Sequence, residues 1–101
     1  MGTYRLLRRA EADLADIVEY TVRTWGVEQA ARYIDDLESC CEMLANRPRL
    51  GRLRDEFRPG LRRMERGRRV VFYRQDSRGI TISRFLHQRM LPTRHMLDDQ
   101  E

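Results

Sequence analysis

The sequence predicts an α+β fold in which a helical hairpin packs on one face of a small antiparallel sheet. Two neighbouring segments, 10–25 and 28–46, space their apolar residues as amphipathic helices do. Three β-type runs follow, at 60–64, 68–74 and 79–86. With a first strand at 3–8 the expected order is β-α-α-β-β-β. A chain of 101 residues closes one modest core, so we expect a single domain over residues 1–101.

The first predicted helix begins near Ala10, directly after the strand at 3–8. Its apolar residues recur at the i, i+3, i+4 and i+7 spacing, and acidic residues fill the opposite face and the first turn. Gly26 follows Trp25 and is expected to end the helix, as glycine commonly does at a C-cap. Tyr20 and Trp25 share the helical spacing, so both are expected in the core or at its edge.

The second predicted helix spans 28–46 and stops at Arg47-Pro48. A single glycine separates the two helices, which requires them to fold back on each other as a hairpin. Cys40 and Cys41 are adjacent and are the only cysteines, so they suit neither a disulfide with each other nor a zinc site. Residues 47–58 are expected to form a basic loop.

The runs 68–74 and 79–86 flank the turn-forming residues 75–78 and therefore predict a β-hairpin. In the first of these strands, alternation places Val70 and Phe72 on one face of the sheet and Arg69 and Tyr73 on the other. We expect Val70 and Phe72 to face the helices, which leaves Arg69 and Tyr73 on the open face of the sheet.

The second strand of this hairpin contains a conflict. Alternation places Arg84 on the same face as Ile80, Ile82 and Leu86. Two solutions are open: a β-bulge near Ser83, or an acidic partner for Arg84 such as Asp13 or Asp16.

The basic residues of the chain are all of one type. The chain has 20 basic residues, all arginine, against 16 acidic ones, with a net charge of +4 and a pI near 9.7. Mechanisms that need lysine are excluded, whereas bidentate contacts to carboxylate or phosphate are favoured. Ten arginines fall between residues 59 and 95 beside only two acids, so the sheet is expected to meet an anionic partner.

The targeting and metal-binding signals are sparse. The chain has no apolar run of 18 residues and no signal peptide near its start, which predicts a cytoplasmic protein without membrane contact.

His87 and His95 are the only histidines. His87 is expected to be structural, while His95 follows the last strand and is close enough in sequence to reach the open face. Neither has ligands at metal-binding spacing, so no metal and no cofactor is expected.

The string RPGLRRMERGRRVVFYR followed by GITISRFLHQRM resembles the ParE toxins of bacterial type II toxin-antitoxin modules, members of the RelE/ParE superfamily. The helical segments ADLADIVEYTVRTWG and AARYIDDLESCCEMLANRPRLGR are similar to that family as well, so the resemblance covers nearly the whole chain. It implies a toxin that inhibits DNA gyrase, is neutralised by a ParD-like antitoxin, and involves nucleic acid only indirectly.

The superfamily also implies an alternative, because its RelE-like members cut mRNA on the ribosome. For that activity Arg69 and Arg89 match two arginine positions, and His95 lies where such enzymes often place a tyrosine; otherwise no catalytic residue is expected. A nucleic-acid-binding module and a plain interaction domain are two further possibilities. For the target or the antitoxin, the expected contact residues are Arg58, Arg62, Arg63, Arg69, Tyr73, Arg74, Arg84, His87 and Arg89.

Overall fold

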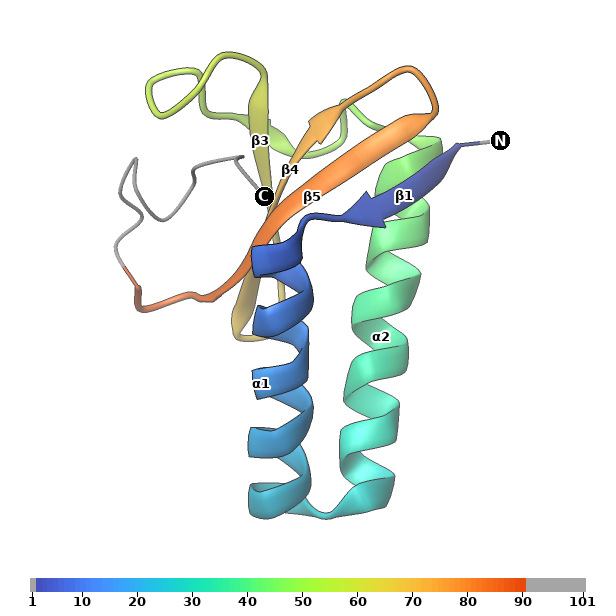
Figure 1. Ribbon diagram of the computed structural model, residues 1–101, viewed down its shortest axis with the longest axis vertical. Coiled ribbons are helices and arrows are strands. Elements are labelled where there is room, and N and C mark those ends of the chain that lie inside the picture. The colour runs from blue at the N-terminus through green and yellow to red at the C-terminus, as the bar shows by residue number, and fades with distance from the viewer. Residues whose placement is uncertain (1, 91–101) are drawn as a thin grey trace.

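The computed structural model describes residues 2–90 as two layers, a five-stranded sheet and two antiparallel helices on one of its faces (Figure 1). The elements are β1 (Thr3–Leu6), α1 (Arg8–Trp25), α2 (Val27–Asn46), β2 (Arg52–Leu53), β3 (Leu61–Arg66), β4 (Arg69–Gln75) and β5 (Gly79–His87). The predicted α+β class, with a helical hairpin on one face, is confirmed. His95 lies outside the described residues.

The sheet has the order β1-β5-β4-β3-β2 and is mixed. β3, β4 and β5 form the predicted antiparallel meander, but β1 pairs in parallel with β5, with Thr3 opposite Gly79 and Leu6 opposite Ile82. The expectation of a purely antiparallel sheet was therefore wrong. Two helices separate β1 from the meander, and a connection of that length allows a parallel pairing.

The helices begin and end within two residues of the predicted bounds. Gly26 has φ +90°, a conformation that favours glycine, and its N–H donates to the Val22 carbonyl at 2.9 Å. In the described chain, no helix combines the length and the apolar character needed to cross a membrane. The helical hairpin extends beyond the end of the sheet (Figure 1), so the sheet cannot cover the apolar stripe near its tip.

The side of β4 that faces the helices is the reverse of the prediction. Val71 and Tyr73 join the main core with residues of both helices, whereas Val70 and Phe72 form a second cluster with residues of β3 and β5. Phe57 of the loop before β3 packs against this second cluster. Both faces of β4 are thus apolar and buried, and alternation alone could not show which face the helices cover.

Both solutions to the conflict in β5 occur together. The register pairs Phe72 with Arg84 but Tyr73 with Ile82, so Ser83 is the extra residue of a β-bulge. Arg84 also forms an ion pair with Asp13 of α1, with Nε–Oδ2 and Nη2–Oδ1 distances of 2.6 and 2.8 Å. Because the bulge reverses the alternation, Leu86 lies in the second cluster and not on the face of Ile80 and Ile82, contrary to prediction.

The loop predicted at 47–58 contains the short strand β2, which the sequence did not indicate. Hydrogen bonds hold its first part against the sheet: the Gly51 N–H donates to the Tyr73 hydroxyl at 2.7 Å, and that hydroxyl donates to the Pro48 carbonyl at 2.9 Å. A buried tyrosine hydroxyl needs such partners. They explain why Tyr73 lies on the helix side and not on the open face.

Candidate functional site

A large recess lies where the helical hairpin extends past the sheet. It has a volume of about 480 Å³, and we call it the hairpin-tip pocket. Its lining residues come from the end of α1, the start of α2, the β3–β4 turn and the end of β5, and they are Tyr20, Thr21, Trp25, Gln29, Tyr33, Gly67, Arg68, Arg69 and His87.

One wall of the hairpin-tip pocket is aromatic. Tyr20 and Trp25 are 56% and 64% exposed, and Tyr33 is half-buried. The expectation that Tyr20 and Trp25 belong to the core or its edge was wrong, because the sheet ends before it reaches them. Large aromatic side chains that remain this exposed beside a recess are typical of surfaces that bind a partner.

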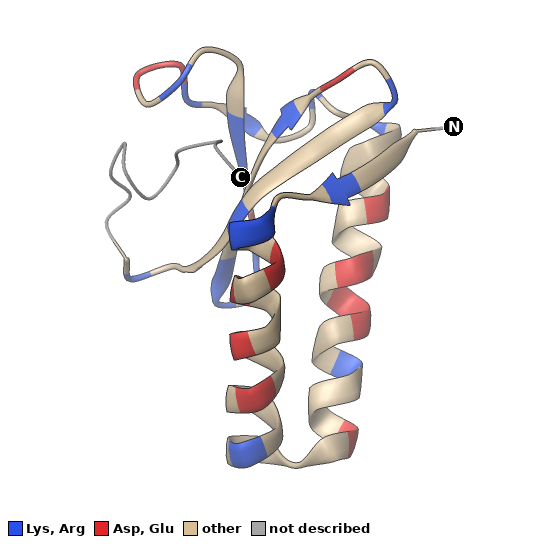
Figure 2. Ribbon diagram, viewed as in Figure 1, with Lys and Arg blue, Asp and Glu red and all other residues tan. Residues whose placement is uncertain are grey.

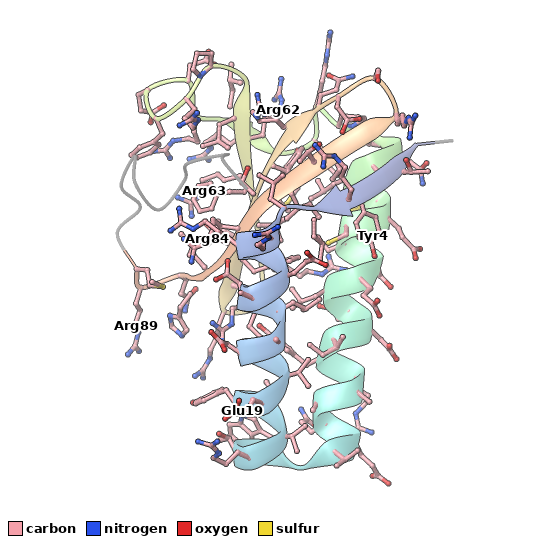
Figure 3. The ribbon with its side chains drawn as sticks, in the orientation of Figure 1. Tyr4, Glu19, Arg62, Arg63, Arg84 and Arg89 are labelled. Atoms are coloured by element: carbon pink, nitrogen blue, oxygen red, sulfur yellow. The ribbon has the colours of Figure 1, made fainter. Side chains whose placement is uncertain are left out.

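The other wall of the pocket is positively charged. Arg69 lies opposite His87 in the β4–β5 register, and Arg68 follows Gly67 in the turn between β3 and β4. Arg89 follows His87 just beyond the strand (Figure 3). Among the residues described, Arg68, Arg69 and Arg89 have no carboxylate within 4 Å, so their charges are available to an anion.

His87 is held in its neutral form. Its Nδ1 accepts a hydrogen bond from the Arg89 backbone N–H at 3.1 Å, which requires that nitrogen to be unprotonated. Partial burial, and then the positive charges of Arg69, Arg89 and Arg68, lower the pKa of His87. The imidazole is therefore an uncharged part of a basic wall.

A second groove continues the pocket along α1. It has a volume of about 360 Å³ and shares Tyr20, Arg69 and His87 with the pocket. β1 pairs with β5 only as far as Ile82, so from Ser83 onward the outer side of β5 adjoins α1. The Phe85 N–H on that side donates to the Asp13 carboxylate at 3.0 Å. The two recesses therefore adjoin each other through these three shared residues.

We expect His87 to titrate below the ordinary histidine value of 6.5. Since the folded pKa is lower than the unfolded one, the folded chain binds fewer protons, and stability should fall as the pH drops through about 6.5 and level off below the folded pKa. An NMR titration of the His95→Gln variant, in which His87 is the one remaining imidazole, measures this directly. A pKa at or above 6.5 would contradict the placement of His87 among three arginines.

Of the predicted contact residues, Arg69 and His87 line the pocket and Arg89 adjoins it through its hydrogen bond to His87, whereas the others lie elsewhere. Tyr73 is fully buried, so its predicted exposure was wrong. Arg84 is engaged with Asp13, because the bulge turns it toward α1. Arg63 pairs with Glu65 at 3.1 Å and lies over the Phe72 ring. Arg58, Arg62 and Arg74 lie toward the opposite end of the sheet, where β3 begins and β4 ends.

Sequence reasoning missed the aromatic wall and Arg68. A usable signal was present: Trp25, Gly26 and Val27 mark the reversal between the helices, and residues at such a reversal lie at a tip that a sheet need not reach. The helical period then places Tyr20 and Tyr33 one or two turns from that tip. Arg68 directly follows Gly67, whose φ of +60° marks the turn.

Comparison with known proteins gives a consistent result. Residues 4–92 match the family model described as the ParE toxin of the type II toxin-antitoxin system parDE. The chain is 47% identical over 96 residues to the toxin ParE1 of Caulobacter vibrioides, covering 95% of this chain and 99% of that one. It is 42% identical to the toxin ParE1 of Mycobacterium tuberculosis, covering 86% and 90%. A solved structure of the chromosomal ParDE system from P. aeruginosa superposes with a TM-score of 0.70 at 27% identity, covering 86% of this chain and 96% of that one.

Proposed function

This chain belongs to the ParE toxin family of type II toxin-antitoxin systems, and on that basis we propose that it inhibits DNA gyrase and is neutralised by a ParD-like antitoxin. The observation that carries the proposal is the hairpin-tip pocket, in which exposed aromatic side chains face arginines that lack acidic partners among the described residues. Such a surface fits a protein partner that supplies both apolar anchors and carboxylates.

The antitoxin segment that fits this surface is amphipathic and acidic. Its apolar side chains would fill the pocket between Tyr20, Trp25 and Tyr33, and its carboxylates would pair with Arg68, Arg69 and Arg89. Val18, Val22 and Val27 are 38%, 38% and 70% exposed on the same hairpin and would widen the apolar contact. An acid beside His87 would raise the pKa of that imidazole, so this binding should strengthen as the pH falls below 7.

We favour inhibition through binding of the target over catalysis of RNA cleavage by this chain. An RNase needs groups that accept and deliver protons, and arginines are poor proton carriers because their pKa stays above about 12. The RelE-like alternative places Arg69, Arg89 and His95 together on the open face of the sheet. Arg69 instead lines a pocket with residues of both helices, and His95 lies outside the described residues.

The target can be tested with purified toxin in two parallel reactions, one with gyrase and plasmid DNA and one with translating ribosomes and mRNA. We expect loss of supercoiling and accumulation of gyrase-cleaved DNA, with the mRNA left intact. Cleavage of mRNA that disappears in the His95→Gln variant, together with unimpaired supercoiling, would replace this proposal by the nuclease.

The antitoxin site can be tested by calorimetric titration of Arg69→Ala and Trp25→Ala with a ParD-like antitoxin that binds the unmodified chain. A hydrogen bond to a charged group contributes about 1.5–3 kcal/mol, so Arg69→Ala should weaken binding at least tenfold. Trp25→Ala should weaken it by about 30-fold or more, since truncating a central anchor costs about 2 kcal/mol or more.

The matched control for this titration is Arg78→Ala, which removes the same charge from the exposed turn between β4 and β5 at the opposite end of the sheet. Its affinity should stay within about twofold of the unmodified chain, because rim charges far from the contact contribute little. If all three variants bind the antitoxin equally well, the hairpin-tip pocket is not its site.

A further inference from the structure

A second concentration of arginine lies at the end of the sheet opposite the hairpin-tip pocket. A groove of about 310 Å³ is lined there by Arg49, Arg62 and Arg74 together with uncharged residues. Of the described residues that line it, none is acidic and none is aromatic. We call it the arginine groove. Figure 3 shows Arg62 at this end of the sheet and Arg89 just beyond the other end of β5.

The arginine groove is built on a firmly held segment. The Arg62 guanidinium donates to the carbonyls of Gly51 at 2.8 Å and Arg49 at 3.3 Å. Tyr73 joins the same segment to the sheet through Gly51 and Pro48, and a side chain at position 51 would collide with the Tyr73 hydroxyl. Cations that are already fixed in place lose little freedom when they bind a ligand.

Further arginines lie in the segment that leads into the groove. Arg47, Arg49 and Arg52 are all exposed within a stretch, 47–53, that contains no acid. These flanking charges add to the positive potential of the lining arginines, which favours binding of an anion.

The whole molecule shows the same separation of charge. Residues 8–46 contain four arginines and nine acids, whereas residues 47–90 contain fourteen arginines and four acids. Figure 2 shows most of the acids on the helices and most of the basic residues on the sheet and its loops. The acidic layer would repel a polyanion and the basic layer would attract it, so a polyanion would approach from the sheet side.

We propose that the arginine groove binds the phosphate backbone of duplex DNA. Guanidinium groups match phosphate oxygens bidentately. Recognition of single strands relies on aromatic side chains on which bases stack, and no described residue of this groove supplies one. This would be a direct contact with DNA, in contrast to the indirect involvement expected from the sequence, and it does not depend on the target being gyrase.

The test is fluorescence anisotropy of a labelled 20-base-pair duplex with purified toxin, in salt from about 50 to 200 mM, the range over which phosphate contacts weaken strongly. The variant Arg49→Gln/Arg74→Gln alters two of the lining arginines and leaves Arg62 and Tyr73 in place. We expect it to weaken binding at least tenfold and to reduce the slope of log K against log salt by about 2, close to 1 for each phosphate that is no longer neutralised.

The control variant Arg23→Gln/Arg32→Gln removes the same charge from exposed positions on the helices. It should keep the affinity and the salt slope of the unmodified chain. Equal weakening in both double variants would show that only net charge matters and would overturn the proposal, as would absence of binding at 50 mM salt.

Two competitors separate the possible anions. Inorganic phosphate at the same phosphate concentration, and polyglutamate of the same total charge, should each displace the duplex poorly. Displacement by inorganic phosphate would reassign the groove to a free anion, and displacement by polyglutamate would reassign it to an acidic protein. Either result would overturn the assignment to DNA, and neither would bear on gyrase inhibition.

Discussion

Replacing Asp13 by alanine should destabilise the fold by about 3–5 kcal/mol, because it would remove the carboxylate that accepts two hydrogen bonds from the Arg84 guanidinium between α1 and the bulge of β5. The side chains of Arg84 and Asp13 are 12% and 14% exposed, so water can compensate only a little. The same carboxylate accepts the Phe85 N–H, which would also be left without its acceptor. Urea denaturation followed by circular dichroism measures the destabilisation.

Two further variants make this prediction specific. Asp16→Ala removes an exposed carboxylate from the same helix and should change stability by no more than about 0.5 kcal/mol. The double variant Asp13→Leu/Arg84→Met should recover much of the stability, since apolar residues of similar size often replace a buried ion pair without cost. A destabilisation below about 1 kcal/mol for Asp13→Ala would mean that the pair behaves as an ordinary surface contact.

Phe72→Ala should be similarly destabilising, although Phe72 faces away from the helices. Its side chain is 2% exposed and packs with Leu61, Val70 and Leu86, and the Arg63 guanidinium lies 5.9 Å from the ring centroid. Truncating a buried phenylalanine costs about 3–5 kcal/mol. In a domain of this size, such a destabilisation lowers the melting temperature by more than about 10 °C.

The contrast with Arg69→Ala tests whether the second cluster is a true core. Arg69 is half-buried at the hairpin-tip pocket and has no carboxylate partner among the described residues, so its removal should change the melting temperature by only a few degrees. Equal melting temperatures for the two variants would show that the cluster around Phe72 contributes no more than a surface contact.

Local signals in the sequence were enough to establish the elements and their order. Helical and strand periods are properties of short segments, and Gly26 and Pro48 mark boundaries through their own backbone preferences. These signals predicted the α+β class, the helical hairpin and the β3-β4-β5 meander, and the same strings carried the resemblance to ParE toxins. The concentration of arginine in the second half of the chain is equally a property of the sequence.

Tertiary packing was needed to establish which face of the sheet the helices cover and which arginines remain available. β4 is apolar on both faces, so its orientation depends on distant partners, and Tyr73 is fixed by residues 22 and 25 positions away. Arg84 pairs with Asp13, which is 71 positions away in the sequence, and Arg66 pairs with Asp36, which is 30 positions away. Contacts of that sequence separation leave no periodic signal, because each depends on how the layers pack. The same packing leaves Trp25 beyond the sheet and places it across a pocket from Arg69.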